Sequence, residues 1–170
     1  MRRWNYDGPT EEFSFFNKND TGEIVWTIYR DTGCQLFPFQ VQMLNRLLEH
    51  HNVISCRGAG RSLIVKGIAQ YYAEKEHRGE LRKLIVKALD RNDYTKSADD
   101  VFNWHNLVEN DLVDERWLES TRTRMSSDVW KREYCCSYTP MSKDQIECKV
   151  HHDDTFILIQ KKREPLLEFF

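Results

Sequence analysis

The stretch that decides the fold reads Val53-Ile54-Ser55-Cys56-Arg57-Gly58-Ala59-Gly60-Arg61-Ser62-Leu63-Ile64. A short β-branched run ends at a glycine-containing turn, and an apolar pattern with helical spacing follows the turn. This order predicts a strand, a loop of the size that holds a phosphate, and a helix. In a P-loop, with the pattern G-x-x-x-x-G-K-[ST], backbone N–H groups surround the phosphates, the lysine meets the β/γ oxygens and the hydroxyl binds Mg²⁺.

The match to that pattern is partial. Gly60 and Ser62 stand where the last glycine and the hydroxyl belong, whereas Ser55 replaces the first glycine and Arg61 replaces the lysine. The start of the following helix adds unpaired N–H donors and a partial positive charge, which favour an anion. A Gly-x-Gly turn before a helix is also a common loop, so this stretch alone leaves phosphate binding and a plain turn both open.

Composition favours a single domain, or one domain with an appendage, in a reducing and cytoplasmic setting. A chain of 170 residues is large enough to bury a core, and its net charge of −2 gives no general reason to expect nucleic acid or an anionic membrane. The five cysteines form no paired spacing of the kind that small secreted proteins use. No apolar run approaches the length of about 20 residues that a membrane span needs, and no signal-peptide core is recognised.

Around the loop, the hydrophobic pattern predicts alternating strands and helices. Strands are expected over residues 23–30, where β-branched and aromatic residues gather, and over residues 83–89, a short apolar run. A helix is expected from about Pro38 to His50, and the helix after the loop is expected to end near Gly79. The fold class is therefore α/β, with a small parallel or mixed sheet and flanking helices.

The second half of the chain is expected to be mainly helical. Ser97-Ala98-Asp99-Asp100 reads as a capping box that opens a helix, and a further helix should span about residues 114–125. Ser126 or Ser127 should cap a short helix that continues to about Tyr134. Short strands are expected over residues 136–139 and 155–160.

Three stretches together resemble the ATPase domain of phage terminase large subunits. Leu36-Phe37-Pro38-Phe39-Gln40-Val41-Gln42-Met43-Leu44 resembles the aromatic-plus-glutamine adenine motif of that family. Ser55-Cys56-Arg57-Gly58-Ala59-Gly60-Arg61-Ser62 is similar to its deviant P-loop, and Asp128-Val129-Trp130-Lys131-Arg132-Glu133-Tyr134-Cys135-Cys136-Ser137-Tyr138 resembles the segment that closes the domain. The resemblance covers roughly residues 36–103 and 112–139.

The resemblance implies a domain division and a set of nucleotide-binding residues. The division is an N-terminal strand and irregular segment over 1–35, a degenerate ATPase-like domain over 36–140, and a tail with one strand over 141–170. The implied ligands are ATP and magnesium, with Gln40 contacting adenine and Arg57 a phosphate. The full candidate set is Gln40, Arg57, Gly58, Gly60, Arg61 and Ser62. The alternative is that Gln40 is a helix-surface amide and that Arg57 and Arg61 are exposed loop cations.

The departures from the family weigh against catalysis. No hydrophobic run ends in the paired acids of a Walker B strand, and Asp90 comes too early in the chain for that role. Hydrolysis needs Mg²⁺ held by a hydroxyl and a carboxylate, together with a group that positions water. The planar guanidinium of Arg61 is also no equivalent of a compact lysine charge. No catalytic or metal-binding residue is therefore assigned, and efficient ATP hydrolysis is not expected.

Two functions follow. The first is a phage-encoded protein in the host cytoplasm that acts by binding another protein, for instance as an inhibitor or decoy of a host defence complex. The alternative is a nucleotide-binding accessory or fragment of the DNA-packaging terminase motor. A DNA surface could be built from basic residues that are balanced by nearby acids: Arg116, Arg122, Arg124, Lys131 and Arg132. No membrane partner is expected.

Overall fold

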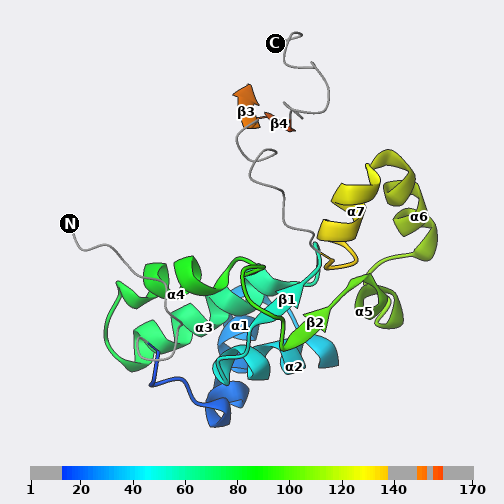
Figure 1. The fold of residues 1–170 in the computed structure, drawn as a ribbon. Helices are drawn as coiled ribbons and strands as arrows, with labels where there is room; N and C mark the ends of the chain where they lie inside the picture. The colour runs from blue at the N-terminus through cyan, green and yellow to red at the C-terminus, as the bar shows by residue number, and fades with distance from the viewer. Residues whose placement is uncertain (1–12, 138–148, 153–154, 159–170) are drawn as a thin grey trace. The chain divides into compact units, whose positions relative to one another are not determined.

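A short parallel sheet stands at the centre of the computed structural model, which describes residues 13–137, 149–152 and 155–158 (Figure 1). Among these residues the sheet has two strands, β1 (Val53–Ser55) and β2 (Asp100–Phe102). Val53 lies opposite Asp100, and Ser55 lies opposite Phe102. The chain between the strands forms α3 (Arg61–Lys75) and α4 (Leu81–Leu89), as a parallel connection requires. The expected mixed α/β class with a small parallel sheet is confirmed.

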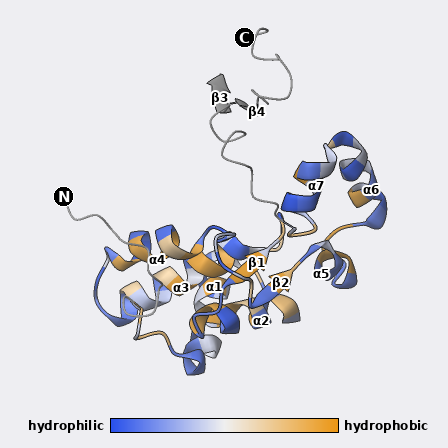
Figure 2. Cartoon of the chain, viewed as in Figure 1, coloured by the Kyte–Doolittle hydropathy of each residue, from blue (hydrophilic) through white to orange (hydrophobic). Residues whose placement is uncertain are grey.

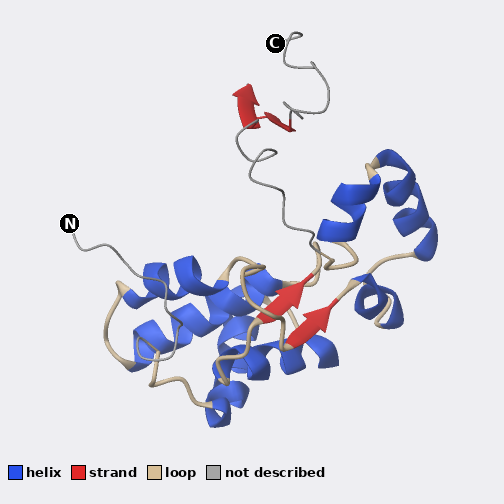
Figure 3. Ribbon diagram, viewed as in Figure 1, coloured by secondary structure: helices blue, strands red, loops and turns tan. Residues whose placement is uncertain are grey.

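The chain divides into two compact units, Met1–Ser137 and Tyr138–Phe170. Besides the elements above, the first unit contains η1 (Lys18–Asp20), α1 (Thr21–Thr32), α2 (Pro38–Leu48), α5 (Trp104–Glu109), α6 (Glu115–Arg124) and α7 (Ser127–Glu133) (Figure 3). In the second unit, β3 (Lys149–His152) pairs antiparallel with β4 (Thr155–Leu158). No helix among the described residues is both long enough and apolar enough to cross a membrane.

Helix α3 is the central helix of the first unit, because it packs against α1, α2 and α4. Its Ile64, Ile68 and Tyr72 are fully buried, and apolar residues gather where β1 meets α1–α3, while α6 and α7 are mostly hydrophilic (Figure 2). Gly67 allows α1 to approach closely, since a Cβ atom at this position would collide with the side chain of Ile28. Tight packing of this kind fixes the helix whose first residues form the candidate site.

The strand expected over residues 23–30 is wrong, because this segment lies within α1. Its β-branched and aromatic composition is typical of a strand, yet the residues that it buries are Ile24, Thr27 and Ile28, at helical spacing. Trp26 and Tyr29 lie outside that buried stripe and are exposed. Gly33 ends the helix in the left-handed conformation, with its N–H bonded to the carbonyl of Tyr29.

The strand expected over residues 83–89 is also wrong, because these residues form most of α4. Leu81, Ile85 and Leu89 are buried at intervals of four, whereas Leu84 remains 40% exposed. A short apolar run cannot be assigned to strand or helix from its length alone. Here the packing of α4 on α3 selects the helix.

The helix expected to begin at residues 97–100 is wrong in its start. Asp100 instead opens β2, and α5 begins at Trp104 with Asn103 as its N-cap. The carboxylate of Asp99 accepts a hydrogen bond from the backbone N–H of Asn52 (2.6 Å), which leads into β1. The two acids that are typical of a helix cap therefore lie at the start of the sheet, where Asp99 bonds to the residue before β1 and Asp100 begins β2.

The remaining helices and strands follow the expectations more closely. The helices expected from Pro38, after the loop, over 114–125 and from Ser126 are confirmed. Asp114 and Ser126 cap the last two through their side chains. Cys136 and Ser137 lie outside any strand, and residues 138–139 lie outside the described residues. The strand expected over 155–160 is confirmed for Thr155–Leu158, and residues 159–160 are likewise outside the described part.

Candidate functional site

The loop between β1 and α3 makes a tight turn that depends on two glycines. The N–H of Ala59 donates to the carbonyl of Cys56 (3.2 Å), which closes the turn. Gly58 and Gly60 have φ angles of +86° and +87°, in the left-handed region that side chains disfavour. Gly60 is also the N-cap of α3, so the first N–H groups of that helix point out of the loop without a side-chain cap.

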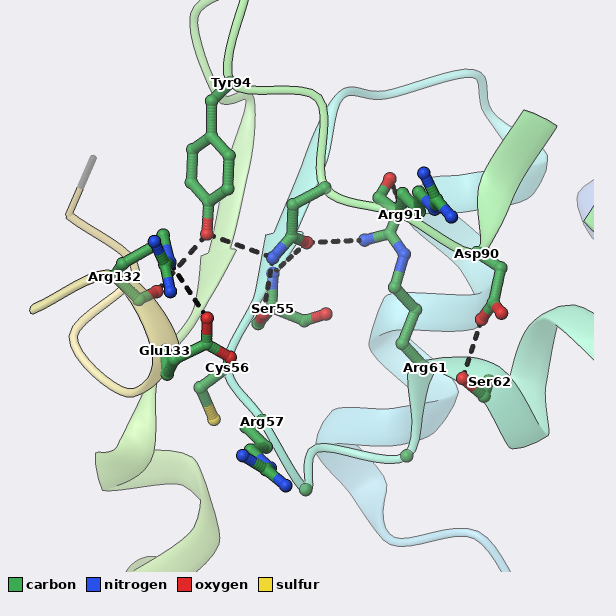
Figure 4. Close-up of a pocket in the computed structure, with 13 residues that line it drawn as sticks. Ser55, Cys56, Arg57, Arg61, Ser62, Asp90, Arg91, Tyr94, Arg132 and Glu133 are labelled. Carbon is green, nitrogen blue, oxygen red and sulfur yellow. Dashed lines mark hydrogen bonds and ion pairs between the residues drawn. The ribbon is translucent and has the colours of Figure 1, made fainter. Parts of the chain in front are cut away.

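A pocket of about 670 Å³, which we call the loop pocket, opens over this turn (Figure 4). It is lined by Ser55, Cys56, Arg57, Gly58, Gly60, Arg61 and Ser62 from the loop and α3, by Asp90, Arg91, Asn92 and Tyr94 after α4, and by Arg132 and Glu133 at the end of α7. Four arginines and two carboxylates give this lining a positive balance. Such a balance, together with a helix start, favours an anionic ligand.

Gln40 lies beside the loop but is occupied by structural bonds. Its side-chain N–H donates to the carbonyl of Ala59 (3.0 Å), and its side-chain oxygen accepts from the N–H of Phe37 (3.0 Å). The residue is only 5% exposed, and its amide packs so close to Gly60 that a Cβ atom there would collide with it. The structure therefore uses Gln40 to join the start of α2 to the loop.

The side chain of Arg61 points away from the loop turn and bonds to the protein itself. Its Nε donates to the carbonyl of Leu89 (2.7 Å). One terminal nitrogen donates to the carbonyl of Val53 (2.7 Å) and the other to that of Arg91 (3.1 Å). Burial lowers the pKa of Arg61 to about 10, so the group stays protonated near neutral pH. A fork with several fixed acceptors suits arginine and not lysine.

Ser62 meets a carboxylate that the sequence reasoning set aside. Its hydroxyl donates to Asp90 (2.7 Å), the residue that follows α4. A hydroxyl with a carboxylate is the protein part of the magnesium site in P-loop enzymes. Among the described residues, however, no three His, Cys, Asp or Glu side chains are grouped to hold a metal. A magnesium ion here would need phosphate and water for most of its ligands.

Two groups in the loop pocket have hydrogen-bonding capacity to spare. Ser55 is only 5% exposed, yet its hydroxyl makes no hydrogen bond to any residue of the described chain, and Figure 4 shows it directed into the pocket. The guanidinium of Arg57 is exposed and is likewise unpaired within the described residues, although its backbone N–H is fixed by the carbonyl of Glu133 (2.7 Å). No fully buried side-chain nitrogen or oxygen atom of the described residues lacks a partner, so the unbonded hydroxyl of Ser55 is open to the pocket, where it can bond to a ligand or water.

Asn92 is one of the site residues that sequence reasoning missed, since it reads as part of a turn. Its side-chain oxygen accepts from the N–H of Ser55 (2.9 Å), and its side-chain nitrogen donates to the carbonyl of Ser55 (2.8 Å). It also contacts Tyr94 (3.1 Å), whose hydroxyl reaches the carbonyl of Arg132 (3.3 Å). No local signal distinguishes this asparagine, because its partners are distant in sequence.

Within the described residues, the cysteines and the basic residues of α6 and α7 are not grouped into a further metal site. Burial raises the pKa of Cys56 to about 12 and that of Cys136 to about 12, so both are neutral thiols at physiological pH. The DNA-surface candidates are all exposed on α6 and α7. Arg132 pairs with Glu133 (2.9 Å), and Arg122 lies over the ring of Trp130 (6.0 Å).

Comparisons with family models, with curated proteins and with solved structures found no match to the chain. The candidate site therefore has to be interpreted from its own geometry. That geometry is a helix start and a positive pocket in which the guanidinium of Arg57 and the hydroxyl of Ser55 have no partner among the described residues. The side chains of Arg61 in the pocket and of Gln40 beside it are bonded within the protein.

Proposed function

We propose that this chain is a phage-encoded, terminase-like P-loop protein with an incomplete sheet, which acts in the host cytoplasm by binding and not by catalysis. The observation that supports this proposal is the position of Arg61. In a P-loop enzyme the residue at this point reaches the β- and γ-phosphates. Here its guanidinium donates to the backbone carbonyls of Val53, Leu89 and Arg91. These bonds lie within the protein, so the guanidinium is not directed at a phosphate.

The catalytic part of the proposal is tested by phosphate release from Mg-ATP, with and without DNA. We expect no release above background for the natural protein, because Arg61, which stands at the position of the P-loop lysine, is bonded to backbone carbonyls and is not available to a γ-phosphate. We expect the same for Arg61→Lys, since a lysine at this position does not supply a group that activates water. Turnover near one per second, a typical enzymatic rate, would contradict the proposal.

In this first proposal the ligand is another protein. The proposed role of this chain is that of an inhibitor or decoy of a host complex. Support comes from the resemblance to terminases combined with the internal use of Gln40 and Arg61. A protein that no longer needs nucleotide should show no binding of Mg-ATP at millimolar concentration. Calorimetry of the full chain with Mg-ATP therefore separates this reading from the next one.

A second function is binding of a nucleotide without turnover, as an accessory or fragment of a DNA-packaging motor. It is favoured by the unpaired hydroxyl of Ser55 and the free guanidinium of Arg57 in one positive pocket. Under this reading Mg-ATP binds with micromolar affinity, and Arg57→Ala weakens it by about ten-fold. Lys66→Ala is the matched control, because Lys66 is exposed on α3 and lines neither pocket. Equal losses for the two variants would contradict a specific role for Arg57.

A further inference from the structure

A second pocket adjoins the loop pocket across Arg57 and Gly58. It has a volume of about 350 Å³, and we call it the apolar pocket. Its walls come from Leu107 on α5, from Val113 and Trp117 at α6, and from Met125 and Tyr134 on either side of α7. Arg57 and Gly58 line both pockets, so the two spaces are neighbours on either side of these residues.

The two pockets differ in the chemistry that they offer. The loop pocket presents the hydroxyl of Ser55, the start of α3 and the guanidinium of Arg57, all of which can donate to an anion. The apolar pocket offers aliphatic side chains and aromatic rings. A ligand that fills both must carry an anionic group directly beside a flat or apolar one.

We infer that the apolar pocket receives the nucleobase of a ligand whose phosphate group lies in the loop pocket. This inference rests on the second proposed function, nucleotide binding, and adds where the base is held. The base would lie on the side of α5–α7 and not beside Gln40. The amide of Gln40 already bonds to Phe37 and Ala59, and the residue is 5% exposed.

Trp117 supplies the surface on which a base can stack. It lines the pocket while 51% of it is exposed, so one side of the residue is available without disturbing the core. Tyr134 forms a fixed wall, because its ring is stacked on that of Trp130 at a centroid distance of 4.7 Å. Aromatic rings bind bases of any sequence through stacking. The volume of the pocket is also within the range of small-molecule sites.

The same chemistry could come from a free nucleotide or from one nucleotide of a single strand. Both carry a phosphate group that is linked through a sugar to a base. These are the two groups for which the loop pocket and the apolar pocket offer matching chemistry. The experiment therefore uses three probes in the same magnesium buffer: ATP, inorganic tripolyphosphate and a short single-stranded oligothymidine. Calorimetry measures their dissociation constants for the full chain.

We expect a base-bearing probe to bind about ten-fold more tightly than tripolyphosphate, which is the range of one stacking contact. Trp117→Ala should remove this advantage and leave tripolyphosphate binding unchanged. Trp26→Ala is the control, because Trp26 is 62% exposed on α1 and lines neither pocket. Thr121→Trp, which fills the apolar pocket from α6, should have the same effect as Trp117→Ala.

The outcomes separate the two proposals. Equal affinities for ATP, oligothymidine and tripolyphosphate would overturn the base pocket and leave the anion site standing. An advantage that survives both Trp117→Ala and Thr121→Trp would also overturn it. Absence of all binding at millimolar concentration would overturn nucleotide binding and the base pocket together. Tight binding of the oligothymidine with weak binding of ATP supports the pocket and identifies the base as part of a strand.

Discussion

At the scale of single residues, Arg61 shows how a position in a motif can change its role. The residue stands where a P-loop has lysine, but its guanidinium holds the end of α4 and one edge of β1. Each of these bonds satisfies a backbone carbonyl near the core. The guanidinium therefore contributes to stability, and its removal should lower the free energy of unfolding more than it changes the affinity for any ligand.

Replacing Arg61 by lysine should lower the free energy of unfolding by about 1–3 kcal/mol, because a single ammonium cannot reach the carbonyls of Val53, Leu89 and Arg91 together. Urea denaturation measures the change. Arg91→Lys is the matched control: its side chain is exposed and unpaired within the described residues, so a change below about 0.5 kcal/mol is expected. Equal effects of the two substitutions would contradict the structural role of Arg61.

The pKa of Cys56 leads to a prediction on pH. The thiol has an ordinary pKa of 9.0, which burial raises to about 12 in the folded chain. Above pH 9 the unfolded chain therefore loses a proton that the folded chain keeps, and the free energy of unfolding must fall as pH rises. Tyr71, whose pKa burial raises from 10.0 to about 12, adds to this decline at higher pH.

Urea titrations between about pH 8 and about pH 11 should show this alkaline decline, and Cys56→Ala should make it shallower. Cys34→Ala, which removes an exposed thiol, is the matched control substitution. A slope that is the same in the natural protein and in Cys56→Ala would contradict the assignment.

The backbone of the site was predictable at the residue scale, but most side-chain roles were not. The β-branched run, the two glycines and the apolar spacing after them predict the strand, turn and helix that the structure shows. Gln40, Arg61 and Asp90 each form a bond to a group 19 to 28 residues away in sequence, with Ala59, Leu89 and Ser62. Local patterns contain no information on such partners.

At the scale of elements, the two wrong strand predictions share a physical cause. Residues 23–30 and 83–89 are rich in β-branched or apolar side chains, and propensity alone favours a strand for each. Both segments pack on α3, and that contact needs one buried residue per turn, which Ile24 and Ile28 or Ile85 and Leu89 provide. Tertiary packing therefore overrides propensity, whereas Pro38 and the caps Asp114 and Ser126 make their helices recognisable from sequence.

The helical assignment of α4 can be tested by two neighbouring substitutions. Ile85→Ala should lower the free energy of unfolding by about 2–5 kcal/mol, because Ile85 is fully buried against the core. Leu84→Ala, with Leu84 40% exposed, should cost less than about 1 kcal/mol. Chemical denaturation gives both values. The reverse order of the two effects would contradict the orientation of this helix.

At the scale of the whole molecule, the small sheet raises the question of how its edge is closed. On one side of β1, the N–H of Cys56 donates to the carbonyl of Phe102 in β2 (2.8 Å), so this side faces the partner strand. Val53 and Ser55 face the opposite edge, where a third strand of a larger sheet would pair. In the described chain, Arg61 bonds to Val53 and Asn92 bonds to both backbone groups of Ser55. Side chains thus occupy the edge that would otherwise invite another strand.

Asn92→Ala should therefore have two effects on the molecule. Ser55 would lose partners for a buried N–H and carbonyl, which costs about 2–4 kcal/mol in the free energy of unfolding. The uncovered edge of β1 should also promote self-association that increases with protein concentration.

Urea denaturation and analytical ultracentrifugation measure these effects. Asn19→Ala serves as the control, because the Asn19 side chain is exposed in η1 and bonds to none of the described residues. An Asn92→Ala protein that keeps both the stability and the sedimentation of the natural chain would show that the edge is protected by other means. A loss of stability without association would mean that Asn92 only provides hydrogen-bond partners for Ser55. Arg61 alone would then be sufficient to keep another strand from pairing with β1.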